Sequence, residues 1–89
     1  MKAIVTVVGK DAVGIIAGVC VELAKYNINV LDISQTVMQG YFTMMMATDV
    51  SQCNVPLADL VTEMARIGEE MGLNIRVQRE DIFQAMHRI

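Results

Sequence analysis

The sequence predicts an α+β fold in which two helices cover one face of a four-stranded antiparallel sheet. The 89 residues switch between strand-like and helical hydrophobic periods in the order strand, helix, strand, strand, helix, strand. Only Gln39-Gly40 separates the two middle strands, and so short a turn requires antiparallel pairing. Together these features predict one βαββαβ domain over residues 1–89, the split βαβ or ferredoxin-like sandwich.

The first strand and helix meet at a corner rich in glycine. Ala3 to Val8 is a nearly continuous apolar, β-branched run, which is typical of a covered central strand. From Ala12 the apolar residues take helical spacing. The predicted helix has Asp11 as its N-cap and is expected to end near Tyr26. The predicted buried face of this helix consists of Val13, Ile16, Ala17, Cys20, Leu23 and Ala24.

The two middle strands show alternation of side-chain type. In Asn29–Gln39 the apolar Leu31, Ile33 and Val37 point one way, and the polar Asp32, Ser34 and Thr36 point the other. In Tyr41–Val50 the side predicted to be buried contains Phe42, Met44, Met46 and Val50. The turn residues Gln39-Gly40 join the two strands into a hairpin.

The second half of the chain contains the second helix and the last strand. Pro56 fits the first turn of a helix, and Gly72 supplies a left-handed stop. Its predicted buried face consists of Leu57, Leu60, Val61, Met64, Gly68 and Met71. Residues 73–78 alternate as a half-solvated strand, which suits an edge of the sheet.

The last residues, 81–89, form a short amphipathic pattern that predicts a small C-terminal helix. Its apolar residues are Ile82, Phe83, Met86 and Ile89. About two turns of helix are not stable alone, so the segment must dock on its own subunit or on a partner, and the sequence leaves both open.

Composition points to self-association and excludes several classes of partner. Apolar residues make up 54% of the chain, more than one small core needs, which favours a homodimer. The net charge is 7 − 10 = −3 without a basic run, which argues against direct binding of nucleic acid. The sequence contains no apolar span of membrane length, so we expect a cytoplasmic protein that has no membrane partner.

The residues that could perform chemistry are few. Cys20 and Cys53 are interpreted as reduced structural thiols, and His87 is the only histidine. No metal-ligand spacing, nucleophile triad or phosphate-binding loop is present, so we expect no metal, no cofactor and no enzyme activity.

The corner from Gly9 to Gly14 is the candidate binding site. Its glycines expose backbone N–H donors, and Asp11 supplies a carboxylate, a combination that suits a small polar molecule. Each feature also has a structural interpretation. Asp11 can act as a helix N-cap that contacts no ligand. Gly14 and Gly18 can allow close packing of the helix instead of leaving room for a ligand.

Three stretches carry a resemblance to a known family. They are Val7-Val8-Gly9-Lys10-Asp11-Ala12-Val13-Gly14-Ile15, the run from Tyr26 to Thr36, and Met38-Gln39-Gly40-Tyr41-Phe42-Thr43-Met44. With them the chain resembles an ACT domain, and most of all the free-standing single-domain ACT proteins, which are related to the ACT repeats of the glycine cleavage system transcriptional repressor. The resemblance covers nearly the whole chain and implies an amino-acid-binding βαββαβ module.

In ligand-binding ACT domains the amino acid lies between the first strand-to-helix loop of one subunit and the start of strand two, often across a side-by-side dimer. By position, this resemblance implies a site made of Gly9, Lys10, Asp11, Ala12, Val13, Gly14 and Asn29. Backbone N–H groups suit a carboxylate, while Asp11 and Asn29 can accept from an ammonium group. Ala12-Val13 stands where an Arg-Pro pair is common, so the loop lacks a restricting proline.

Two functions follow from these observations. The first is a regulatory module, a homodimer that senses an amino acid or related small metabolite and acts through a protein partner. The alternative is a structural or interaction protein that dimerises through its sheet or helices and retains only a vestigial ligand site.

Overall fold

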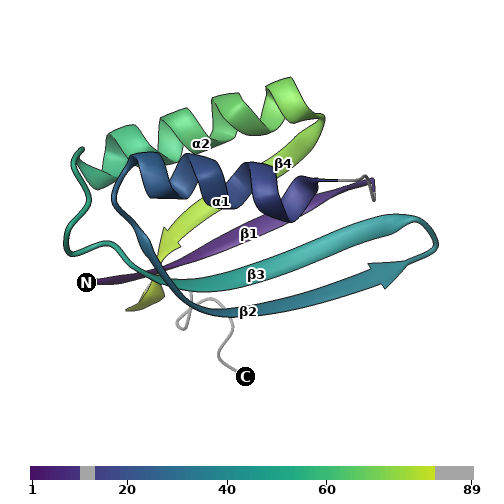
Figure 1. Ribbon diagram of the computed structural model, residues 1–89, viewed down its shortest axis with the longest axis horizontal. Coiled ribbons are helices and arrows are strands. Elements are labelled where there is room, and N and C mark those ends of the chain that lie inside the picture. The colour runs from purple at the N-terminus through teal and green to yellow at the C-terminus, as the bar shows by residue number, and fades with distance from the viewer. Residues whose placement is uncertain (11–13, 82–89) are drawn as a thin grey trace.

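The computed structural model, which describes residues 1–10 and 14–81, has the predicted α+β fold (Figure 1). Along the chain the elements are β1 (Lys2–Lys10), α1 (Ile15–Lys25), β2 (Asn29–Met38), β3 (Tyr41–Asp49), α2 (Leu57–Met71) and β4 (Leu73–Arg79). The strands form one sheet in the order β2-β3-β1-β4, in which all neighbours are antiparallel. Both helices lie on the same face of the sheet, which confirms the βαββαβ prediction.

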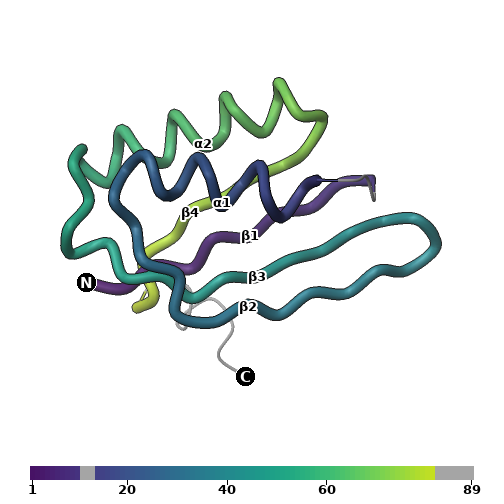
Figure 2. Tube along the Cα trace, in the orientation of Figure 1, coloured from purple at the N-terminus to yellow at the C-terminus, as the bar shows by residue number. Residues whose placement is uncertain are grey.

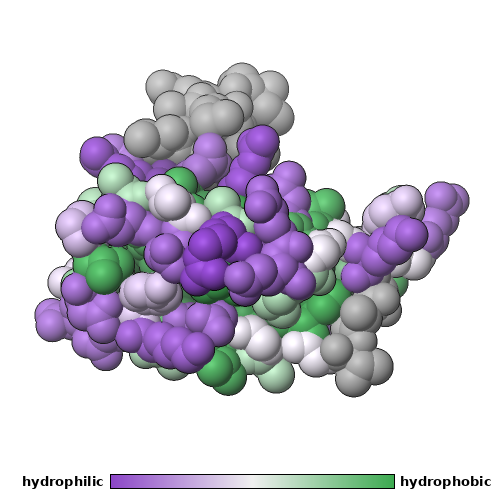
Figure 3. All heavy atoms as spheres, turned by 90° about the horizontal axis from the view of Figure 1, so that it is seen from above, coloured by the Kyte–Doolittle hydropathy of each residue, from purple (hydrophilic) through white to green (hydrophobic). Residues whose placement is uncertain are grey.

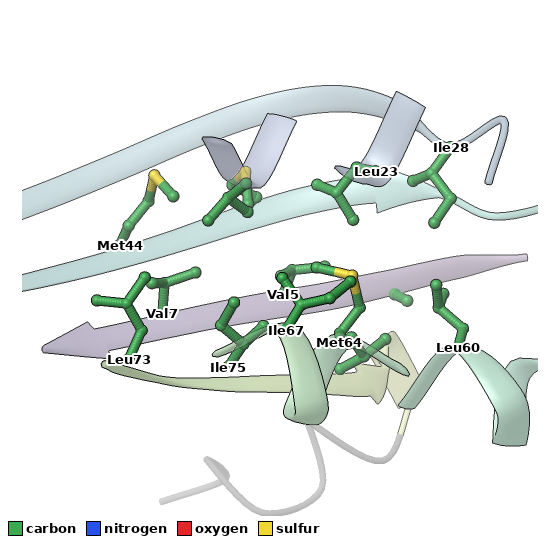
Figure 4. Packing of buried hydrophobic residues seen from close by; sticks show 14 of the residues in the cluster. Val5, Val7, Leu23, Ile28, Met44, Leu60, Met64, Ile67, Leu73 and Ile75 are labelled. Carbon is green, nitrogen blue, oxygen red and sulfur yellow. The ribbon is translucent and has the colours of Figure 1, made fainter. Parts of the chain in front are cut away.

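The hydrophobic core lies between the helices and the sheet. Side chains from β1, β3, β4 and both helices point into this one layer (Figure 4). Alternate residues of the strands supply it, as predicted for β3 and β4: Val5, Val7, Phe42, Met44, Met46, Leu73, Ile75 and Val77. The buried hydroxyl of Thr48 donates to the Ala3 carbonyl oxygen at 2.8 Å, so the polar group in this layer is satisfied.

The β2–β3 hairpin forms at the predicted turn. Gln39 has φ 53° and Gly40 has φ 81°, and Met38 pairs with Tyr41. Positive φ at both central residues matches the right-handed twist of the strands, which stabilises a two-residue turn. The turn therefore fixes the register of β2 against β3 from Met38 back to Asp32, where a β-bulge shifts it by one residue.

Helix α1 differs from the prediction at its start and in its buried face. Gly14 has φ 86° and occupies the N-cap position, so the helix begins at Ile15 rather than Ala12, and the expected N-cap role of Asp11 is wrong. The residues buried from α1 are Ile15, Val19 and Leu23, of which only Leu23 was predicted. Nearly every residue of this helix is apolar, so periodicity alone does not select the face that packs on the sheet.

Helix α2 follows the prediction more closely. Leu60, Met64 and Gly68 are buried as expected, and Ile67 is buried in addition. Val61 and Met71, which were also assigned to the buried face, are exposed. Pro56 occupies the N-cap position just before the helix, and Gly72 ends it in the predicted left-handed conformation.

Close packing of α2 on β4 depends on a glycine. A Cβ atom at Gly68 would lie 2.9 Å from the Leu73 carbonyl oxygen and 3.2 Å from the Ile75 nitrogen. Between the two helices, a Cβ at Gly18 would lie 2.9 Å from the Met71 Cε atom. The first contact is with rigid backbone, whereas the second is with the end of a flexible side chain.

These two contacts predict different effects of alanine. Gly68→Ala is expected to lower the free energy of unfolding by about 1–3 kcal/mol, because the new methyl group meets the β4 backbone. Gly18→Ala is expected to be neutral or slightly stabilising, since the Met71 side chain can move and alanine gains up to about 1 kcal/mol of helix propensity. Urea denaturation measures both values, and equal losses would contradict this account of the packing.

Candidate functional site

The predicted site residues lie at opposite ends of the sheet within one chain. Lys10 pairs with Tyr41, beside the β2–β3 turn. Asn29 pairs with Asp49, which in turn pairs with Lys2 at the far end. The nine residues of β1 at about 3.3 Å per residue separate the two ends by about 26 Å (Figure 2). One chain therefore brings Gly9, Lys10 and Gly14 together but leaves Asn29 apart from them.

The loop end of the sheet carries the positive end of α1. Gly14 has no side chain to cap the first amides, and the first turn contains no acidic residue. The helical hydrogen bonds begin with the Gly18 amide donating to the Gly14 carbonyl at 2.9 Å. Lys10 is exposed at this same end. Helix amides that no side chain of residues 1–10 and 14–81 caps, together with a nearby lysine, attract a carboxylate or another anion.

Gly9 has a structural explanation that involves no ligand. A Cβ atom at this position would lie 2.5 Å from the Leu73 Cδ2 atom, so the start of β4 needs the space that glycine leaves. The predicted Asp11, Ala12 and Val13 lie outside the described residues.

The Asn29 end of the sheet contains a shallow hollow of about 290 Å³. Its lining residues are Ala24, Asn27, Ile28, Asn29 and Gln52. The Asn27 side-chain amide donates to the Gln52 carbonyl, and the Asn54 amide donates to the Lys25 carbonyl, both at 3.0 Å. These bonds tie the turn before β2 to the loop after β3. Among residues 1–10 and 14–81, the Asn29 side chain has no hydrogen-bond partner, so its amide is available to a ligand.

A carboxylate that the sequence did not single out, Asp49, lies beside Asn29 on the neighbouring strand. The hydroxyl and backbone N–H of Ser51 hold the pKa of Asp49 below its ordinary value, and the N-terminal amine 3.9 Å away adds to this. Asp49 therefore stays ionised at neutral pH and can attract an ammonium group. The register of the predicted hairpin would pair Asn29 with Val50. A β-bulge between Val30 and Asp32 shifts the pairing to Asp49, so the sequence offered no signal for this neighbour.

Strand β2 is exposed along most of its length. Every residue from 31 to 40 is exposed, and Ile33, Val37 and Met38 are 41%, 54% and 68% accessible. Ile33 and Val37 pair with the buried Met46 and Phe42, so they point toward the helix layer without being covered by it. The strand lies at the sheet edge, beyond α1 (Figure 1). A long apolar edge is a surface that soluble proteins cover or pair.

The rest of the described surface offers little chemistry. Residues 1–10 and 14–81 contain no group of three or more His, Cys, Asp or Glu side chains that could hold a metal ion. Cys20 and Cys53 are half-buried and not joined in a disulfide. No helix in these two ranges is both long and apolar enough to cross a membrane.

Comparison with known proteins gives consistent similarities. The family model described as ACT domain matches residues 2–78. The chain is 53% identical to a UPF0237 protein of Listeria innocua over 89 residues, which cover all of both chains. Among solved structures, an ACT domain protein from Streptococcus pneumoniae has 43% identity and a TM-score of 0.83 over 94% of each chain. A putative glycine cleavage system transcriptional repressor, at 21% identity and TM-score 0.73 over 88% of this chain and 44% of that one, shares the fold.

The conformation of Gly14 predicts how the helix start responds to substitution. Gly14→Ala is expected to lower the free energy of unfolding by about 1–2 kcal/mol, because φ 86° is unfavourable for alanine. Among residues 1–10 and 14–81, no atom lies within 4 Å of the added Cβ, so the loss is conformational rather than steric. Gly14→Asn should lose less, since asparagine tolerates the left-handed region better. Chemical denaturation compares the two variants; an alanine variant as stable as the parent would contradict a left-handed N-cap.

Proposed function

The chain belongs to the ACT domain family, whose members are generally small-ligand regulatory modules. We propose that it is a homodimer that binds an amino acid or related small metabolite and acts through a protein partner. The observation that carries the proposal is the uncovered β2 edge, with Asn29 at one end and the β1–α1 corner beyond the other. A second copy of the chain joins these two ends.

Antiparallel pairing of two β2 strands about a twofold axis accounts for the separated residues. In such a pair, Asn29 of one copy lies opposite the Met38 end of the other. Met38 pairs with Tyr41, and Tyr41 pairs with Lys10, so the β1–α1 corner lies at this same end of the sheet, with β3 between it and β2. The symmetric dimer therefore contains two equivalent sites, each built from both chains.

The chemistry of each composite site suits the two charged groups of an amino acid. The amides at the start of α1, with Lys10 nearby, attract the carboxylate. The carbonyl oxygen of the partner copy's Asn29 side chain accepts from the ammonium group, assisted by the charge of Asp49. Asp11, Ala12 and Val13 complete the proposed contacts, and Gly9 leaves the space that Leu73 occupies beside the corner.

The proposal assigns no catalytic role. It needs groups that bind charge and an interface whose stability depends on the bound ligand, and the proposed β2 dimer is meant to supply both. The structural alternative, an interaction protein with a vestigial ligand site, dimerises through its sheet or helices and binds no amino acid.

A thermal-shift screen against the twenty amino acids tests ligand binding. A ligand at 100 times its dissociation constant should stabilise the protein by about 2.7 kcal/mol, which raises Tm by about 4–8 °C per kcal/mol in a domain of this size. We expect one amino acid or a small related set to shift Tm, and Asn29→Ala to abolish the shift. Asn74→Ala, an exposed asparagine on β4 at the other edge of the sheet, is the control that should keep it. No shift at millimolar concentration would favour the vestigial-site alternative.

A charge at the β2 edge tests the dimer separately. Val37→Lys is expected to shift the protein toward monomer, because pairing two edges would bring the new charges together and desolvate them. Val21→Lys is the matched control, since Val21 on α1 is 56% exposed and Val37 is 54% exposed. Sedimentation velocity measures the mass of each. A Val37→Lys variant that stays dimeric would exclude β2 as the interface.

A further inference from the structure

The outer backbone edge of β4 is open, although the inward side chains of this strand are buried beneath α2. β4 is the last strand in the sheet order and pairs with β1. Among residues 1–10 and 14–81, no strand pairs with its other side. In an antiparallel edge strand, alternate residues direct both backbone polar groups away from the sheet. From 73 to 77, no other described residue bonds to these outward groups.

A groove, here called the β4 groove, follows this edge beside α2. Two hollows of about 420 and 330 Å³ share Ala65, Asn74 and Ile75, so they adjoin along the strand. Val61, Ala65 and Glu69 line the helix side, and every residue from 73 to 78 lines the strand side. Because successive side chains of a strand point to opposite faces, a lining by six consecutive residues means that the strand edge itself forms the floor.

The two sides of the β4 groove differ in chemistry. On the helix side, Val61 is 39% exposed, and Ala65 is exposed one turn further along α2. On the other side, Arg76 is exposed and forms no ion pair with any residue of 1–10 and 14–81. A segment paired with β4 would alternate in the same way, with apolar side chains against α2 and an acidic side chain beside Arg76.

From these observations we infer that the β4 groove binds an extended segment of another protein, which alternates apolar with acidic side chains and adds to β4 as a strand. The six residues of β4 that line the groove span about 20 Å, so the segment is about six residues long. Main-chain hydrogen bonds to the open edge supply affinity, and the side chains supply selectivity. The inference rests on the proposed function only for the existence of a protein partner, and it requires neither the amino acid nor the β2 dimer.

A second copy of the chain fits the β4 groove less well than a foreign segment. Symmetric antiparallel pairing over the full length of β4, Leu73–Arg79, would place the central Arg76 of each copy opposite the other. Like charges directly opposite each other destabilise a strand pair. Because β2 lies at the other edge of the sheet, a dimer through β2 leaves both β4 grooves at its outer ends.

Selection from a display library of random ten-residue peptides on the purified protein tests the inference. The enriched peptides should alternate apolar with acidic residues, and one of them, made synthetically, is the probe. Added to isotope-labelled protein, the probe should shift the amide signals of residues 73–78, Val61 and Ala65. It should also slow hydrogen exchange of the outward β4 amides. Enriched peptides without this alternation, or shifts confined to other strands, would contradict the assignment.

Two valines separate the groove from the rest of the surface. Val61→Glu should weaken binding of the probe about tenfold, because it places a charge against the apolar side of the peptide. Val21→Glu, at an exposed valine of α1, should leave binding unchanged. Val37→Lys should also bind the probe normally, which distinguishes this surface from the β2 interface. Equal weakening by Val61→Glu and Val21→Glu would exclude the groove.

A charge exchange tests the role of Arg76. Arg76→Glu should weaken binding of the probe several-fold, and a probe whose acidic residue is replaced by lysine should recover most of that loss. A lysine probe that binds Arg76→Glu no better than the original probe would contradict the predicted contact.

The same experiments identify other occupants of the groove. A second copy would raise the mass of the Val37→Lys variant with protein concentration, and the probe would lower it again. Residues 82–89 of the same chain would leave no peptide enriched. Either result would overturn the inference, whereas a thermal-shift screen without a hit would overturn only the amino acid ligand.

Discussion

The close contact of α2 with β4 determines how the helices sit on the sheet. Gly68 lets the helix backbone approach Leu73 and Ile75, and Gly9 on the neighbouring strand β1 leaves space for the Leu73 side chain. Helix α1 then packs against α2 where Gly18 meets Met71. The two helices lie about 10 Å apart and are anchored at the β4 edge of the sheet. They therefore do not extend over β2 at the opposite edge, which stays uncovered (Figure 1).

This asymmetry separates the two edges of the sheet. At β4, residues 73, 75 and 77 are buried beneath α2, so the edge belongs to the core of the monomer. At β2 the apolar residues face the helix side without cover, and their burial requires another molecule. If a second copy provides it, ligand and dimer are linked by mass action: a ligand that contacts both chains stabilises the dimer by the free energy of its binding.

The sequence predicted the structure correctly where a turn motif or the alternation of apolar and polar side chains leaves one arrangement. Gln39-Gly40 permits only a tight turn, and β4 alternates apolar with polar residues, so the turn and the buried face of β4 were predicted correctly. The buried face of β3 was also predicted correctly, although Met45 and Ala47 make its other side partly apolar. In α1 the residues Ile15, Ile16 and Val19 are all apolar, so packing rather than periodicity selects the buried side. Periodicity assigned Ile33 and Val37 to one face of β2, but it could not reveal that no helix covers them, because layer positions depend on glycine contacts elsewhere.

The charge distribution of α2 argues against an interface through the helix layer. Its outer face is polar (Figure 3), and Arg66 lies 2.8 Å from both Glu63 and Glu70. The hydrogen bond from Arg66 holds the pKa of Glu63 below its ordinary value, and Glu63 raises the pKa of Arg66. Exposed pairs of this kind contribute under about 1 kcal/mol to stability and would have to lose water to enter an interface. A second copy gains more by covering the apolar β2 edge, where the buried area consists of hydrocarbon and unpaired backbone rather than hydrated charge.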